Sequence, residues 1–190
     1  MMEDKGKETV RCFIALELCA VHQKELWRQC RKWRESYNRF RWGTPDNYHL
    51  TLAFLGDQPP EVLTAVTHQL HRTLASVTET TFSIDQLQLF PPRRPHVVAA
   101  SVVPSPALNL LYRNVIQACM ACGIELTRSS RSFHPHITVA RFRPQTFRDK
   151  PDPLPLNLTL PLAAVVLYSS ELRREGAIHR VMERFTLQRG

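Results

Sequence analysis

The sequence of 190 residues predicts a single α+β domain, residues 1–190, made of two similar lobes around a central cleft. Segments with strand and helix patterns follow one another in a similar order in both parts of the chain. A motif of His, apolar residue, Thr, apolar residue and Ala begins at His49 in one part and at His136 in the other. Nothing in the sequence marks a linker between independent domains, so we expect the lobes to share one core.

Both copies of the motif predict a half-buried strand with two polar side chains on one face. Because alternate side chains of a strand point the same way, His49 and Thr51 would share a face, and the apolar residues between and after them would enter the core. His136 and Thr138 would repeat this arrangement. Two such strands, paired across a pseudo-two-fold axis, would bring all four side chains into one cleft.

The His-x-Thr spacing is a weak signal by itself. A third match, at His71, lies in a segment with a helical pattern, where residues two apart point in different directions and form no joint surface. For either of the other copies alone, a structural histidine would be the simpler interpretation. The matching apolar context of the two copies favours a functional site built by duplication.

The first strand is expected at Val10–Leu18, which is rich in β-branched and apolar residues. A helix should follow, because apolar residues recur with helical spacing at Leu26, Cys30, Trp33 and Tyr37. The opposite face of this helix is basic and comprises Lys24, Arg28, Arg31, Lys32 and Arg34. Such a face could contact phosphates, although a solvated helix face is the more common interpretation.

A turn-rich segment, residues 41–47, leads into the first motif, whose strand should stop at Gly56. Pro59 and Pro60 then open a helix, a position that proline tolerates. Its apolar stripe is Val62, Val66, Leu70, Leu74 and Val77. Phe82–Phe90 alternates imperfectly, which predicts a strand with room for a β-bulge, and His96–Val103 should be a further strand.

The next helix is predicted to end at Gly123, a typical C-terminal cap. Its apolar positions are Leu108, Leu111, Val115, Ala118 and Cys122. A polar, basic loop at residues 128–132 leads into the second motif. We expect Pro144–Pro155 to be a proline-rich connection before two last strands, Leu162–Leu172 and His179–Leu187.

The charge and composition favour a cytoplasmic protein with a polyanionic partner. The net charge is +8 and the pI is about 9.7, but charge alone does not separate RNA from DNA or an acidic membrane. There is no apolar run typical of a signal peptide or a transmembrane helix, so we expect no membrane association. Five scattered cysteines fit reduced cytosolic thiols.

We expect no metal ion and no cofactor. Cys119 and Cys122 form a C-x-x-C pair, but they sit near a helix C-terminus, whereas reactive thiolates favour a helix N-terminus. No second pair completes a four-ligand zinc site, and His68 and His71 have no third ligand nearby. A glycine-rich phosphate loop is also missing from the sequence, so ATP use has no support.

Three segments together resemble one known family: residues 13–15 (FIA), residues 47–56 (NYHLTLAFLG) and residues 133–141 (FHPHITVAR). The chain is similar, over nearly its whole length, to the two-histidine phosphoesterase superfamily and within it to the RNA 2′,3′-cyclic phosphodiesterases, historically called 2′-5′ RNA ligases. The resemblance implies a bilobal fold of antiparallel sheets with outer helices. It also implies metal-independent hydrolysis of RNA 2′,3′-cyclic phosphate ends to 2′-phosphates, with reversible 2′-5′ ligation in some members.

Opening a cyclic phosphodiester needs one proton removed from water and one delivered to the departing ribose oxygen, and two imidazoles can do both. The hydroxyls of Thr51 and Thr138 would donate to the non-bridging oxygens. By resemblance His49 is the proton donor and His136 the proton acceptor, although the symmetry of the motifs leaves the reverse order open.

The resemblance also makes Arg141 an additional phosphate ligand. Strict alternation places Ala140, not Arg141, on the face of the motif histidine, so a bulge or the end of the strand would have to turn Arg141 inward. Phe13 has two interpretations, a ring that stacks on a base of the substrate and an aromatic residue of the core.

Two further functions use the same residues. The site could act on another substrate, such as a small cyclic nucleotide or a 2′-5′-linked oligonucleotide, or it could run the reverse ligation. The chain could also be an RNA-binding module whose histidines and threonines only hold phosphate. We expect a monomer whose partner is RNA with 2′,3′-cyclic phosphate ends or a small cyclic nucleotide.

Overall fold

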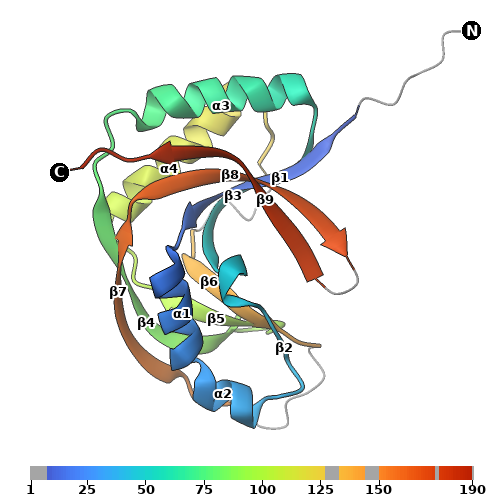
Figure 1. Ribbon diagram of the computed structural model, residues 1–190, viewed down its shortest axis with the longest axis vertical. Coiled ribbons are helices and arrows are strands. Elements are labelled where there is room, and N and C mark those ends of the chain that lie inside the picture. Colours follow the sequence, from blue (N-terminus) through green and yellow to red (C-terminus); the bar gives the residue numbers. More distant parts are fainter. Residues whose placement is uncertain (1–7, 127–132, 144–149, 174–175, 190) are drawn as a thin grey trace, which may run out of the picture.

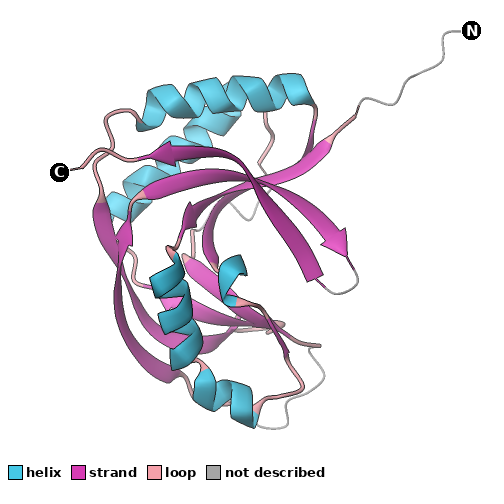
Figure 2. Ribbon diagram, in the orientation of Figure 1, coloured by secondary structure: helices cyan, strands magenta, loops and turns pink. Residues whose placement is uncertain are grey.

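The computed structural model describes residues 8–126, 133–143, 150–173 and 176–189, and it is dominated by one curled antiparallel sheet (Figures 1 and 2). The strands are β1 (Val10–Glu17), β2 (Arg41–Trp42), β3 (His49–Gln58), β4 (Thr80–Phe90), β5 (Val97–Val102), β6 (His136–Arg141), β7 (Leu154–Leu162), β8 (Ala164–Arg173) and β9 (Gly176–Thr186). Their order in the sheet is β7-β4-β5-β6-β3-β1-β8-β9, and β2 pairs with β6. The predicted α+β class is confirmed.

The two motif strands, β3 and β6, meet at the centre of this sheet. Their pairing joins Leu50 to Ile137, and both side chains are fully buried. Each of these residues directly follows its motif histidine, so equivalent positions of the two motifs pair with each other. A pseudo-two-fold axis therefore passes between β3 and β6. It relates one half of the sheet, β7-β4-β5-β6, to the other, β3-β1-β8-β9.

The helices are distributed over the two halves (Figure 1). They are α1 (Ala20–Gln29), α2 (Arg31–Ser36), the short 3₁₀ helix η1 (Pro45–Asn47), α3 (Pro60–Leu74) and α4 (Pro106–Ala121). The single helix predicted after β1 is in fact two, because the backbone of Cys30 turns to ψ −4° between α1 and α2. The predicted end of α4 is confirmed by Gly123, whose φ of 78° lies in the left-handed region that favours glycine.

Strand β7 was not predicted, because the sequence analysis assigned the prolines up to Pro155 to a connection and placed the next strand at Leu162. Proline lacks the N–H that a central strand would donate, so it is confined to edge strands and bulges. β7 is such an edge: among the described strands it pairs with β4 alone, where Pro155 lies opposite Gln86 and Pro161 opposite Thr81. The β-bulge predicted in the Phe82–Phe90 segment is present between Ile84 and Gln86.

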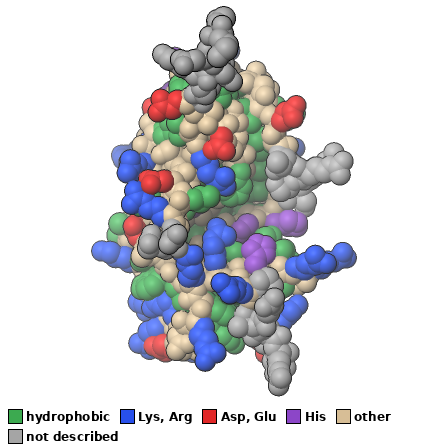
Figure 3. All heavy atoms as spheres, turned by 90° about the vertical axis from the view of Figure 1, so that its right-hand side faces the viewer, with side chains coloured by type: hydrophobic (Ala, Val, Ile, Leu, Met, Phe, Trp, Pro, Cys, Tyr) green, Lys and Arg blue, Asp and Glu red, His purple; other side chains and the backbone are tan. Residues whose placement is uncertain are grey.

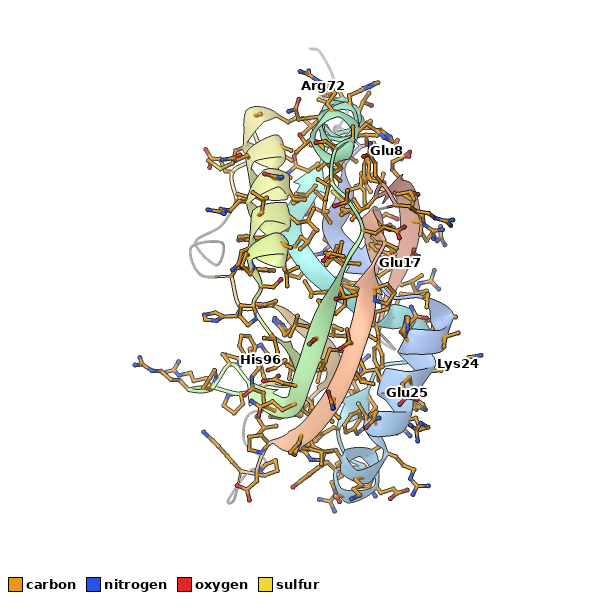
Figure 4. All side chains as sticks on the ribbon, turned by 90° about the vertical axis from the view of Figure 1, so that its left-hand side faces the viewer. Glu8, Glu17, Lys24, Glu25, Arg72 and His96 are labelled. Carbon is orange, nitrogen blue, oxygen red and sulfur yellow. The ribbon has the colours of Figure 1, made fainter. Side chains whose placement is uncertain are left out.

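The basic face of α1 and α2 is partly paired within the helices themselves. Arg28 forms an ion pair with Glu25 at 2.7 Å, and the guanidinium of Arg34 lies 3.5 Å from the ring centroid of Trp27. Figure 4 shows Lys24 pointing outward from α1. These contacts fit a solvated helix face. No helix in the described part of the chain is long and apolar enough to cross a membrane.

Candidate active site

The four polar side chains of the motifs come together at the junction of the two sheet halves. Continuing the antiparallel register one residue beyond the Leu50–Ile137 pair sets His49 opposite Thr138 and Thr51 opposite His136. Each of the four is half-buried. In Figure 3, histidine side chains gather in a hollow between the upper and lower halves of the molecule, with Lys and Arg side chains around them. The predicted convergence of the two motifs is present.

A backbone carbonyl holds each motif imidazole by its Nδ1 atom. The Nδ1 of His49 lies 2.7 Å from the carbonyl oxygen of Asn47, and the Nδ1 of His136 lies 2.8 Å from that of His134. Because a carbonyl oxygen only accepts hydrogen bonds, Nδ1 must be the donor in both rings. Nε2 is therefore the atom of each ring that is left to exchange a proton with a ligand.

Apolar surroundings lower the pKa of both motif histidines. A phenyl ring packs on each imidazole: the ring centroid of Phe13 lies 4.8 Å from that of His49, and the centroid of Phe90 lies 4.6 Å from that of His136. Burial, followed by the nearby charge of His179, lowers the pKa of His49 to about 4. Burial is also the main cause that lowers the pKa of His136. Both rings are thus neutral at pH 7 in the free protein.

A β-bulge turns Arg141 toward the site. In the pairing of β6 with β5, Val139 is an extra residue between Thr138 and Ala140, which restarts the alternation. Arg141 therefore lies on the same face of the sheet as Thr138. Its positive charge lowers the pKa of both motif histidines, as expected of a neighbouring cation. The inward turn that the sequence analysis required is present.

His179 on β9 belongs to the same cluster, and sequence analysis missed it. Its ring centroid lies 5.3 Å from that of His49 and 4.9 Å from that of Phe13. Its Nδ1 atom is buried and has no hydrogen-bond partner within the described residues. Burial, followed by the charge of Arg141, lowers the pKa of His179. In the sequence His179 was simply a histidine at the start of a predicted strand. Its closeness to His49 could not be predicted, because β1 and β8 lie between β9 and β3 in the sheet.

Phe13 lies beneath the site, at the centre of a cluster of rings. Its exposed fraction is 3%, and besides His49 and His179 it stacks on Tyr168, with ring centroids 5.2 Å apart. Phe13 thus packs against the imidazole of His49 on the side of the core. A contact between Phe13 and a base of the substrate stays a prediction.

Cys119 and Cys122 do not have the lowered pKa of reactive thiols. Burial raises the pKa of Cys119 to about 12 and also raises the pKa of Cys122, whereas a nucleophilic thiolate needs a lowered pKa. No group of three or more His, Cys, Asp or Glu side chains that could hold a metal ion occurs among the residues whose placement is described.

Residues 22–169 match the model of the 2′-5′ RNA ligase superfamily. The chain belongs to this superfamily. The resemblance found in the sequence is thereby confirmed.

Curated relatives share one name with each other. The chain is 28% identical over 185 residues to an RNA 2′,3′-cyclic phosphodiesterase of Methanothermobacter thermautotrophicus, covering 94% of this chain and 99% of that protein. It is 29% identical over 170 residues to the protein of the same name from Geobacillus stearothermophilus, covering 85% of this chain. The match spans 52%, about half, of the length of that relative.

Solved structures share the fold. The crystal structure of TT0787 of Thermus thermophilus matches with a TM-score of 0.81 at 27% identity, covering 94% of this chain and 98% of that chain. E. coli LigT complexed with 3′-AMP matches with a TM-score of 0.76 at 26% identity, covering 95% and 99% of the two chains.

Proposed function

We propose that this chain hydrolyses 2′,3′-cyclic phosphate at the ends of RNA to a 2′-phosphate without a metal ion. The observation that carries the proposal is the pair of imidazoles at the pseudo-two-fold axis, each fixed at Nδ1 and each opposite a motif threonine. The name shared by the curated relatives agrees with this activity. The net charge of +8 favours encounter with an RNA chain.

The reaction needs two proton transfers on opposite sides of the phosphorus. The Nε2 atom of His136 takes a proton from water as the water oxygen bonds to phosphorus. The bond from phosphorus to the ribose 3′-oxygen breaks, and Nε2 of His49 gives a proton to that oxygen. The products are a 2′-phosphomonoester and a 3′-hydroxyl, and each proton transfer contributes roughly 10²–10⁴ in rate.

The charge that develops on the phosphoryl oxygens needs donors on the protein. Thr51 and Thr138 each follow their motif histidine by two positions on the same strand, and their hydroxyls donate to the non-bridging oxygens. Arg141, turned inward by the bulge, supplies a positive charge to the same group. Donors placed in this way contribute roughly 2.7–4 kcal/mol each in well-studied sites.

The bound substrate sets the protonation that the reaction needs. His49 follows the family resemblance as the proton donor, yet its pKa of about 4 leaves it neutral in the free protein near pH 7. The phosphodiester is an anion, and an anion beside an imidazole raises the pKa of that imidazole. Substrate binding therefore favours a protonated imidazole beside the phosphate, and the family resemblance, not the pKa values, assigns that proton to His49 and the role of the base to His136.

The test is hydrolysis of a short RNA that ends in a 2′,3′-cyclic phosphate, in EDTA, with the position of the product phosphate read by ³¹P NMR. We expect a 2′-phosphate from the wild type, and a loss of turnover by several orders of magnitude in His49→Ala and His136→Ala. His68→Ala on α3 is the control for the loss of an exposed histidine. No turnover by the wild type, with RNA affinity unchanged in both site variants, would instead indicate a protein that only binds phosphate.

A further inference from the structure

The two motif strands are equivalent over a longer stretch than the motif itself. In the pairing of β3 with β1, Leu52 is an extra residue between Thr51 and Ala53, as Val139 is in β6. The burial of six successive residues is the same in the two strands, from each histidine to an exposed residue five positions later. The pseudo-two-fold axis therefore relates Phe54 on β3 to Arg141 on β6.

Phe54 has the environment of a ligand contact and not of a core residue. Its exposed fraction is 66%, although the bulge places it on the face of the sheet that carries Thr51. Its ring centroid lies 6.1 Å from that of Phe13, and the centroid of Phe13 lies 4.8 Å from that of His49. A line of rings thus runs from the imidazole of His49 through a buried phenyl ring to an exposed one.

Single exposed apolar side chains are common on protein surfaces. Phe54 differs because its symmetry partner is the cation of the site and because both side chains share the face of the motif histidines. A nucleotide has the two chemical parts that such a pair suits, an anionic phosphate and a flat base. Exposed aromatic rings beside basic groups are the usual platforms for unpaired bases.

We propose that Phe54 stacks on the nucleobase of the terminal nucleotide whose cyclic phosphate lies between His49 and His136. The inference rests on the proposed function, since the position of the phosphate fixes the position of the base. Stacking on a phenyl ring uses the face that every base has, so this subsite accepts all four bases. Each half of the duplicated sheet thus contacts one part of the nucleotide: Arg141 on β6 is the cation for the phosphate, and Phe54 on β3 is the ring for the base.

The kinetic test compares Phe54→Leu and Phe54→Trp on two substrates: an RNA with an ordinary terminal nucleotide and the same RNA with an abasic terminal ribose 2′,3′-cyclic phosphate. We expect Phe54→Leu to raise KM for the ordinary end by about five- to hundredfold with little change in kcat, as loss of one base stack predicts. Phe54→Trp should keep the KM of the wild type. On the abasic end the wild type and both variants should have the same KM.

The matched control is Leu110→Ala, which removes an exposed apolar side chain from α4. An unchanged KM of Phe54→Leu on the ordinary end would overturn the inference, and so would an equal loss on the abasic end. Calorimetric titration with 2′-AMP and with ribose 2-phosphate separates this inference from the proposed activity. Tighter binding of 2′-AMP by the wild type, lost in Phe54→Leu, would support the base platform even if the wild type hydrolysed no cyclic phosphate. Equal binding of the two ligands by the wild type would refute the platform.

Discussion

Replacing His49 should remove a large part of the acid sensitivity of this protein. Burial lowers the pKa of His49 in the folded chain to about 4, while an unfolded histidine titrates at about 6.5. Between these values the unfolded chain binds a proton that the folded chain does not bind. The free energy of unfolding therefore falls as the pH drops through this window, and a shift of this size corresponds to about 3 kcal/mol between pH 7.5 and pH 4.

The measurement is urea unfolding of the wild type and of His49→Gln at these two pH values, followed by tryptophan fluorescence. The difference in unfolding free energy between the two proteins should move by about 3 kcal/mol, with the wild type losing more on acidification. With a urea dependence of about 1–3 kcal/mol per molar, the midpoints should move apart by at least about 1 M. Groups that titrate in both proteins cancel in this difference.

His68→Gln on α3 is the control, because it removes an imidazole that is exposed. A change below about 1 kcal/mol for His49→Gln would refute the burial of a neutral His49 as the cause. The same result would follow if the imidazole of His49 were well solvated in the folded chain, since its pKa would then stay near that of the unfolded chain.

Three further outcomes are expected. A plot of kcat/KM against pH should be bell-shaped for the wild type, with the acid and alkaline sides both having midpoints below pH 6.5, because the pKa values of His49 and His136 are both lowered in the free enzyme. A midpoint of the alkaline side above pH 7 would contradict this prediction. His179→Phe should move the midpoint that reports His49 in this pH profile to higher pH, because the charge of His179 is the second cause of the lowered pKa of His49. An unchanged midpoint would show that the charge of His179 does not act on His49. Leu50→Ala should reduce the free energy of unfolding by about 2–5 kcal/mol in urea unfolding, because Leu50 is fully buried at the centre of the sheet. Leu110→Ala, at an exposed position, is the control, and an equal loss in both variants would contradict a central role of Leu50 in the core.

The sequence by itself determined the elements whose pattern is local. Alternation placed the histidine and threonine of each motif on one face of a strand, and the same rule sent Leu50 and Ile137 into the core. The repetition of the motif predicted a site at a pseudo-two-fold axis, and the structure has the Leu50–Ile137 pair there. These features depend on neighbouring residues along the chain, so one sequence was enough to derive them.

Only the tertiary structure decided which other side chains reach the site. An extra residue in β6 turns Arg141 inward and one in β3 does the same for Phe54, and each bulge is defined by its register with a partner strand far away in sequence. His179 reaches His49 although β1 and β8 lie between their strands in the curled sheet, and β7 is a strand despite its prolines because it lies at the edge. Register, curvature and edge position arise from packing between distant segments, and no local pattern records them.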